Sequence, residues 1–241
     1  MKNPTFIYLL LSLYTFSFAQ QTTNIELPYI KPGEAVTSHT GFTLLYNEQH
    51  KQASWVAYKL TQSQTNKQHQ RKNNFKADPK ITSNTDFSND YKSCGYDRGH
   101  LCPAADMAWS EATMSESFYY SNLSPQEPSF NRGIWKELET LVRSWAIIEK
   151  EIYIVTGPVL TSIIGSIGSN KVTIPKYYYK VIYAPIQNKM IALVLPNQKS
   201  DNPLHSFVIT VDSLEILTNI NFFPSLPESL ESQIQITEFS W

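Results

Sequence analysis

Cysteine and histidine are too scarce and too scattered in this sequence to build the metal sites that those residues usually form. Only Cys94 and Cys102 occur among the 241 residues, and a zinc site takes about four ligands. The five histidines do not cluster at the short spacing of zinc ligands. These counts argue against a zinc enzyme. For the two cysteines, a disulfide and two reduced side chains both remain open.

Other protein classes are disfavoured because their sequence signatures are missing. No repeat of 20 to 50 residues is present, which argues against a solenoid. A serine hydrolase needs a nucleophile motif such as Gly-x-Ser-x-Gly, and residues 165–168 (Gly-Ser-Ile-Gly) do not fit it.

Long hydrophobic runs are confined to the N-terminus. Lys2 precedes an apolar run over residues 6–18, which is shorter than the roughly 20 residues of a membrane-spanning helix. Ser17 and Ala19 are small residues suited to a cut after Ala19. Residues 1–19 therefore predict a secretory signal peptide, with a membrane anchor as the alternative. We expect an exported protein, periplasmic or secreted, with no membrane span in the mature chain.

Positive charge is not in excess, but it is unevenly distributed. Residues 1–19 contain one lysine and no acidic residue, so the remainder has 19 basic and 21 acidic side chains. This balance argues against tight, charge-driven binding of nucleic acid by the whole surface. One stretch of 22 residues holds a single acid and six basic side chains: Lys59, Lys67, Arg71, Lys72, Lys76 and Lys80. A basic face toward a polyanion and an ordinary solvated loop are both compatible with this stretch.

The chain after residue 19 predicts an α+β domain with many strands and few helices. We expect a polar lead-in over 20–40, flexible as far as about Pro32, and one domain over 41–241. Residues 61–93 are polar and predict long loops, and 103–108 predict a short helix or structured loop. Strand composition marks six segments: 42–46, 54–60, 152–157, 177–184, 190–195 and 206–211.

The best-supported helix begins near Asn131. A buried stripe at helical spacing is formed by Ile134, Leu138, Leu141, Val142 and Trp145. Asn131, Trp135 and Glu139 are spaced i, i+4 and i+8. This spacing predicts that Asn131 and Glu139 share one face of a single helix.

Two short motifs carry the chemistry. The first is Tyr96-Asp97-Arg98-Gly99-His100, and the second runs from Asn122 through Asn131 to Glu139. Cleaving a phosphodiester needs a base for water, a cation at the phosphate and a positive group for the developing charge. His100, a metal on Asn131 and Arg98 could supply one each.

Together the motifs resemble the DNA/RNA non-specific endonuclease family, the ββα-metal nucleases that include Serratia-type nuclease and endonuclease G. The resemblance covers roughly residues 46–227. It implies a central antiparallel sheet, a ββα-metal finger and a metal-bearing helix. It also implies Mg²⁺ as cofactor, with Mn²⁺ as an alternative, and DNA and RNA as substrates bound through the phosphate backbone.

The resemblance assigns roles to individual residues. His100 would be the general base and Asn131 the single protein ligand of the metal, although Asn131 could instead cap its helix. Glu139 would bind metal-bound waters, or be a solvated helix charge. The other candidate catalytic residues are Asn122, near the active centre, and the phosphate-binding pair Arg98 and Arg71.

Two neighbours of these residues have supporting roles. Asp97 would orient neighbouring groups by ion pairing, and Gly99 would avoid a steric obstruction. We therefore expect a sequence-non-specific endonuclease that leaves 5′-phosphate ends. The alternative is a degenerate module that only binds nucleic acid. The oligomeric state is open.

Overall fold

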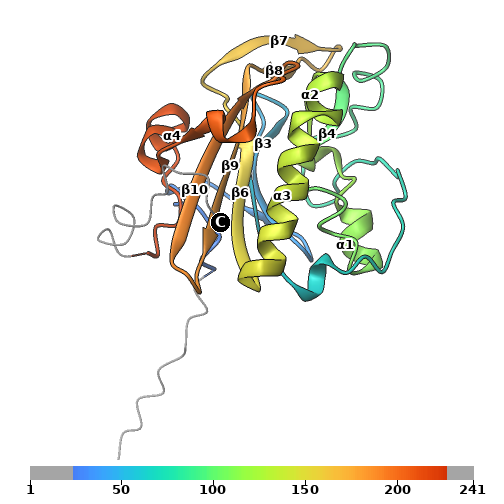
Figure 1. Ribbon diagram of the computed structural model, residues 1–241. Helices are drawn as coiled ribbons and strands as arrows, with labels where there is room; N and C mark the ends of the chain where they lie inside the picture. The colour runs from blue at the N-terminus through green and yellow to red at the C-terminus, as the bar shows by residue number, and fades with distance from the viewer. Residues whose placement is uncertain (1–23, 227–241) are drawn as a thin grey trace, which may run out of the picture.

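The computed structural model describes residues 24–226, and its centre is a seven-stranded sheet in which every neighbouring pair is antiparallel (Figure 1). The signal-peptide prediction for residues 1–19 lies outside the described residues. The strands, in spatial order, are β1 (Thr37–Ser38), β2 (Thr43–Asn47), β3 (Gln52–Thr61), β6 (Glu151–Pro158), β9 (Tyr177–Ala184), β10 (Lys189–Pro196) and β11 (Val208–Ile209).

Two short ribbons and a few helices complete the fold. The ribbons are β4 (Asp97–His100) with β5 (Leu123–Gln126), and β7 (Ile163–Ile167) with β8 (Val172–Pro175). The α-helices are α1 (Glu111–Glu116), α2 (Pro128–Arg132), α3 (Ile134–Glu149) and α4 (Val211–Thr218), and short 3-10 turns occupy Ser63–Thr65, Tyr120–Asn122 and Leu204–Phe207. The prediction of an α+β fold with a large antiparallel sheet and few helices is confirmed.

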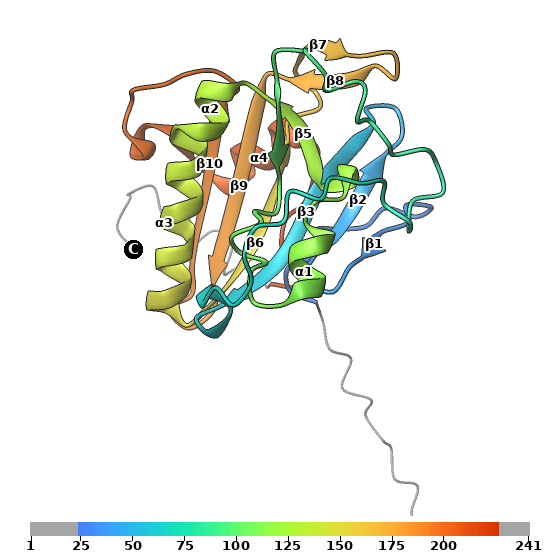
Figure 2. The same ribbon diagram turned by 90° about the vertical axis from the view of Figure 1, so that its right-hand side faces the viewer.

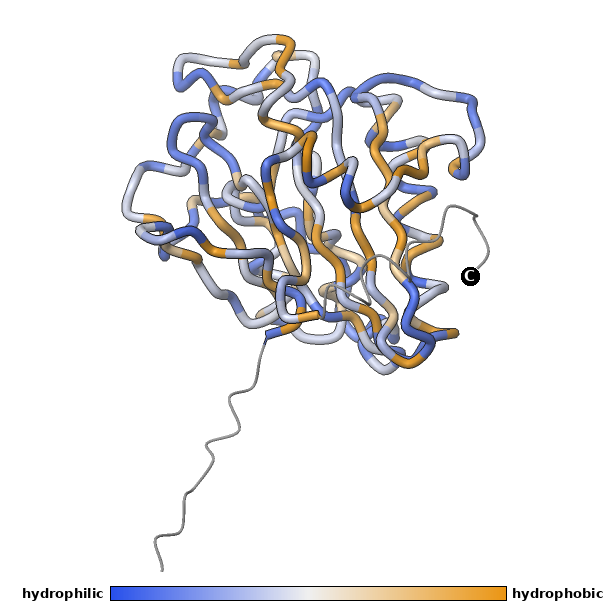
Figure 3. The backbone as a smooth tube through the Cα atoms, turned by 90° about the vertical axis from the view of Figure 1, so that its left-hand side faces the viewer, coloured by the Kyte–Doolittle hydropathy of each residue, from blue (hydrophilic) through white to orange (hydrophobic). Residues whose placement is uncertain are grey.

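The sheet separates two hydrophobic cores, because alternate residues of a strand face opposite sides. On β3, Val56 and Tyr58 belong to the core beneath α3, whereas Trp55 and Ala57 belong to the core on the other side. Figure 2 shows α3 lying along one face of the sheet. Figure 3 looks from the opposite side and shows hydrophobic colours along the strands. The residues that carry the chemistry lie on the α3 side.

The predicted lead-in is part of the fold from its first described residues. Ile25, Leu27, Ile30 and Val36 pack against the core opposite α3. Burying these side chains ties the N-terminal segment to the sheet. The prediction of a flexible segment up to about Pro32 was therefore wrong from residue 24 on.

The helix predicted to begin near Asn131 is broken. α2 ends at Arg132, Gly133 has φ −101° and ψ −115°, and α3 begins at Ile134. A Cβ on Gly133 would lie 2.4 Å from the carbonyl oxygen of Ser129, so glycine permits this tight turn. Asn131 and Glu139 are thus on different helices, and their prediction on one shared helix face was wrong. The buried stripe itself is confirmed by Leu138 and other residues on α3.

The strand predicted over 206–211 was also wrong at both ends. Residues 204–207 form a 3-10 turn, only Val208–Ile209 pair with β10, and α4 begins at Val211. The hydroxyl oxygen of Thr210 accepts a hydrogen bond from the backbone N–H of Ser213 at 3.1 Å. This is an N-cap, which favours a helix despite the β-branched composition. The β7–β8 ribbon and α1 were not predicted.

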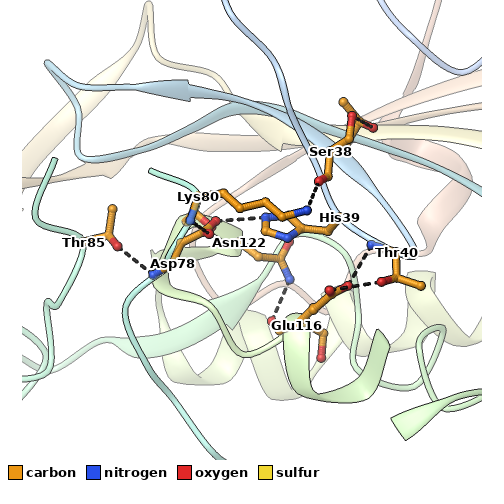
Figure 4. A network of polar contacts seen from close by, with 11 residues as sticks. Ser38, His39, Thr40, Asp78, Lys80, Thr85, Glu116 and Asn122 are labelled. Atoms are coloured by element: carbon orange, nitrogen blue, oxygen red, sulfur yellow. Dashed lines mark hydrogen bonds and ion pairs between the residues drawn. The ribbon is translucent and has the colours of Figure 1, made fainter. Parts of the chain in front are cut away.

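The long loop over residues 61–93 was correctly predicted, and it is anchored at Asp78 (Figure 4). His39 Nε2 lies 2.9 Å from Asp78 Oδ2, and the Ser121 hydroxyl donates to the same oxygen. The Asp78 backbone N–H donates to the Thr85 hydroxyl at 2.8 Å. Burial opposes ionisation of Asp78, but the hydrogen bonds from His39 and Ser121 outweigh it and lower the pKa of the carboxyl. A fixed anion thus holds the loop against the fold.

Candidate active site

The two halves of the sequence signature pair directly with each other. β4 and β5 are antiparallel, with His100 opposite Leu123 and Asp97 opposite Gln126. Residues that are more than 20 positions apart thereby become neighbours, and α2 follows β5 after a single residue. The ribbon places Arg98 and His100 on one face and Asp97 on the other, since side chains alternate along a strand.

His100 is a buried side chain held by aromatic rings. Its ring meets Phe118 edge-on at a centroid distance of 4.9 Å, and Phe75 lies 6.2 Å away. Its Nε2 is buried and has no hydrogen-bond partner within residues 24–226. Burial, with the positive charge of Arg71 as a smaller cause, lowers the pKa of His100 to about 3. The imidazole is therefore unprotonated at neutral pH.

Arg71 and Arg98 approach this site from different segments. The Arg71 guanidinium lies 5.0 Å above the Phe118 ring, and its Nε donates to Asn73 Oδ1 at 2.7 Å. The Arg98 guanidinium lies 4.9 Å above the Phe75 ring, and its buried Nε has no hydrogen-bond partner in the described part of the chain. Aromatic faces hold both cations in place while leaving donors for an anion.

Asn131 is oriented by Asp97. The Asn131 side-chain nitrogen donates to Asp97 Oδ2 at 2.8 Å, and Arg132 forms a two-pronged ion pair with the same carboxylate. The helix cap at this point is Glu127, whose side chain accepts from the Phe130 N–H, so Asn131 does not cap the helix. No hydrogen bond within residues 24–226 uses Asn131 Oδ1, which leaves this oxygen available to a cation. The ion pair agrees with the orienting role predicted for Asp97.

Glu139 lies among charged groups on the α3 side of the site. It is half-buried, and no hydrogen bond to its carboxylate is formed by the part of the chain that the structure describes. Burial raises the pKa of Glu139 to about 7, against the opposing positive charges of Lys180, Arg143 and Arg71. Arg71 thus influences both Glu139 and His100, which ties the two predicted residues to one site.

Asn122 is a structural residue in this arrangement. Its amide donates to the carbonyls of Cys102 at 2.9 Å and Ser117 at 2.8 Å, and accepts from the Cys102 N–H at 2.9 Å. The Leu101 N–H also donates to the Asn122 backbone carbonyl. These bonds use both N–H donors and the oxygen of the amide, and they fix the segment that follows His100. Asn122 can therefore act by positioning His100.

A hollow of about 420 Å³ opens at the centre of this arrangement. Of the predicted site residues it is lined by Arg71, Arg98 and Asn131, together with Asp97. His100 and Glu139 do not line it: the His100 ring is 6.2 Å from the ring of the lining residue Phe75, and the charge of Glu139 interacts with that of Arg71. The hollow combines the two predicted cations, Arg71 and Arg98, with an oriented amide oxygen, and the unprotonated His100 lies close to its lining residue Phe75. This set can hold a phosphate and activate water.

Sequence reasoning gave no role to three residues in or behind the site. Arg132 and Tyr96 also line the hollow, and their adjacency to predicted residues was an available signal. Lys180 is fully buried, 3.1 Å from the Thr156 hydroxyl and 3.4 Å from the Leu101 carbonyl. Nothing local in the sequence marks a lysine in a strand as buried behind the site.

Gly99 is required by a side chain. A Cβ at this position would lie 2.1 Å from Gln126 Oε1 and would also meet the rest of that buried amide. The predicted obstruction is therefore real, and the obstructing group is Gln126 on the paired strand. A bare backbone here lets β4 and β5 close over the amide.

The described residues contain no disulfide, no cluster of metal ligands and no membrane-spanning helix. Cys94 and Cys102 are both free. Within residues 24–226, no three histidine, cysteine, aspartate or glutamate side chains are grouped so that they could hold a metal ion. In the same range, no helix has both the length and the apolar character needed to cross a membrane.

Known proteins are similar to this chain in sequence and in fold. The family model described as DNA/RNA non-specific endonuclease matches residues 20–229. Mitochondrial Endonuclease G of Homo sapiens is 31% identical over 216 residues, covering 82% of this chain and 73% of its own length. Nuclease C1 of Cunninghamella echinulata var. echinulata is 33% identical over 227 residues, covering 84% and 89%. A chain in a crystal structure of the EndoG/EndoGI complex matches with a TM-score of 0.78 at 30% identity, covering 86% of this chain and 91% of that chain.

Proposed function

The chain belongs to the DNA/RNA non-specific endonuclease family, and on that premise we propose that it is an exported, Mg²⁺-dependent endonuclease acting on DNA and RNA. The observation that carries the proposal is one hollow lined by Arg71, Arg98 and Asn131. The β4–β5 pairing brings His100 and Arg98 of β4 next to β5, which leads into the helix that carries Asn131. Phosphate-backbone contacts hold a polymer without reading its sequence, so the cleavage is not sequence-specific.

His100 is the general base. Its low pKa keeps the imidazole unprotonated at neutral pH, and Asn122 holds the segment that follows it. His100 removes a proton from the water that attacks phosphorus, and the bond from phosphorus to the 3′ oxygen breaks. The products carry 5′-phosphate and 3′-hydroxyl ends. Arg98 and Arg71 stabilise the negative charge that builds up on the phosphate oxygens.

Asn131 would hold the magnesium ion through Oδ1, because Asp97 already occupies its side-chain nitrogen. Magnesium favours oxygen ligands and retains several waters, so one amide oxygen and phosphate oxygens form a suitable set. Glu139, with a carboxylate that makes no other hydrogen bond within residues 24–226, would accept from those waters. When bound, the ion supplies Lewis-acid activation of the phosphate and stabilises the leaving oxygen. Mn²⁺ has the same ligand preference and is an alternative. Together β4, β5 and α2 would form the ββα-metal finger.

Export rests on the N-terminal sequence alone. Residues 1–19 have the charged start, apolar run and small residues of a signal peptide. One relative has a different location by its name, because Endonuclease G is mitochondrial. N-terminal sequencing of the protein isolated from a periplasmic extract or culture medium tests this, and the expected first residue is Gln20. A protein found only in the cell interior with Met1 still attached would contradict the proposal.

The nuclease proposal is tested with supercoiled plasmid and structured RNA, incubated with the purified protein. The arms are Mg²⁺, EDTA and the His100→Ala variant. Cleavage of both polymers that stops with EDTA and in the variant is the expected result. A folded parent protein that binds these polymers but cleaves neither with Mg²⁺ or Mn²⁺ would be a binding module, and the proposal would fail.

A further inference from the structure

A second hollow adjoins the proposed active site. It has a volume of about 710 Å³ and shares one lining residue, Arg71, with the 420 Å³ hollow around Asn131. A phosphate held by Arg71 would therefore sit at the boundary between them. Whatever group is attached to that phosphate on this side must pass over or into the second hollow.

The lining of the second hollow is apolar at its base and polar at its rim. The apolar part comes from Ala104, Ala105, Ala108 and Met114, three of which are buried. The polar part is the segment 67–70, which offers a lysine, two glutamine amides and an imidazole, and no acidic residue lines the hollow. A nucleobase has the matching chemistry, with apolar faces and a hydrogen-bonding edge, and it comes attached to a phosphate.

The wall of this hollow is fixed by hydrogen bonds to backbone carbonyls. The N–H groups of Gln68 and His69 both donate to the carbonyl of Ala108 at 2.9 Å. The side chain of Thr113, at the start of α1, donates to the Met107 carbonyl at 2.7 Å. The loop and the floor are thereby held at a set distance, so the space is preformed. Preformed pockets of this size are typical of small-molecule and cofactor sites.

We propose that the second hollow binds one unstacked nucleobase next to the scissile phosphate, so that the protein favours single-stranded stretches of DNA and RNA over regular duplex. The proposal rests on the nuclease function and narrows its substrate class. A base inside a duplex has both faces covered by its neighbours and must leave the stack to enter a pocket. A single strand offers its bases without that cost. Because the lining has no acidic group and two cations, the attached phosphates are tolerated.

The experiment compares three substrates that share one sequence. They are a single strand without self-complementarity, the same strand in a blunt duplex, and the same strand with abasic nucleotides. Each is cleaved by the parent, by Ala105→Leu, which fills the hollow, and by Ala35→Leu as an exposed control that lines neither hollow. The measured quantity is kcat/KM for each combination.

The expected result is a non-additive pattern. The parent favours the intact single strand over the duplex and over the abasic strand on the order of tenfold, since only the intact strand presents a free base. Ala105→Leu removes that preference and changes cleavage of the abasic strand little, whereas Ala35→Leu behaves as the parent. Equal cleavage of intact and abasic strands by the parent would overturn the proposal, and so would an equal slowing of all three substrates by Ala105→Leu.

Failure of the nuclease function is distinguishable from failure of the base site. If the parent cleaves nothing, fluorescence anisotropy of the labelled strands in EDTA still compares intact with abasic binding. Tighter binding of the intact strand, lost in Ala105→Leu, would support the base site without catalysis. Equal binding of the two strands would overturn it.

Discussion

Replacing the buried His100 is expected to make the free energy of unfolding depend less on pH below neutrality. His100 is 8% exposed and its pKa is lowered to about 3, whereas an ordinary histidine has a pKa of about 6.5. Between these values the unfolded chain binds a proton that the folded protein does not. Stability from this group is therefore complete above the unfolded pKa and is lost as pH falls.

The size of the effect follows from how far the pH lies below the pKa of histidine in the unfolded chain. For each pH unit below about 6.5, the free energy of unfolding falls by about 1.4 kcal/mol, until the pH reaches the pKa of His100 in the folded protein. At pH 5.0 the parent should therefore have lost roughly 2 kcal/mol through His100 alone. The His100→Ala variant does not carry this loss. Its cavity lowers stability too, but by a similar amount at both pH values.

The assay is urea unfolding of the parent and of His100→Ala, at pH 7.5 and at pH 5.0, followed by tryptophan fluorescence. The drop between the two pH values should be about 2 kcal/mol larger in the parent. A core variant without a titrating group, Leu193→Ala, serves as control and should keep the pH dependence of the parent. Equal drops in the parent and in His100→Ala would refute the burial argument.

Two further predictions concern Asp97, which orients Asn131, and Lys180, which affects the pKa of Glu139. Asp97→Ala should raise the Mg²⁺ concentration for half-maximal cleavage by about ten- to hundredfold, since Asn131 loses the acceptor that orients it; an unchanged Mg²⁺ titration would contradict this. Lys180→Met removes the positive charge that most opposes the raised pKa of Glu139, so the acid limb of the kcat/KM profile should move to higher pH. The matched control is Lys189→Met, and a limb that stays in place in both variants would show that Lys180 does not hold Glu139 ionised.

The sequence and the structure agree best where neighbouring residues decide the outcome. Strand β9 was predicted with its observed bounds, 177–184, because β-branched and aromatic residues dominate that run. The break at Gly133 was not foreseen, because the apolar spacing of α3 continues smoothly through the preceding residues. Glycine is needed at this turn because the Ser129 carbonyl leaves no room for a Cβ, and that contact exists only in the folded backbone.

The candidate site divides along the same line. The motif residues His100, Asn131 and Glu139 were nominated from their types and order, and the structure places all three near Arg71 or its hollow. Arg71 was nominated through the resemblance to the family. Its position above Phe118 follows from packing of a loop that has no regular structure, which residue patterns do not encode.

The sequence by itself determined the family, most strands of the sheet and the residue types that carry the chemistry, because these depend on local patterns. Only the tertiary structure decided which states those residues adopt. His100 is unprotonated because it is buried among aromatic rings, and the charge of Glu139 interacts with that of Lys180, a residue 41 positions later on β9. Desolvation and charge pairing depend on distances across the fold, and chain spacing does not fix those distances.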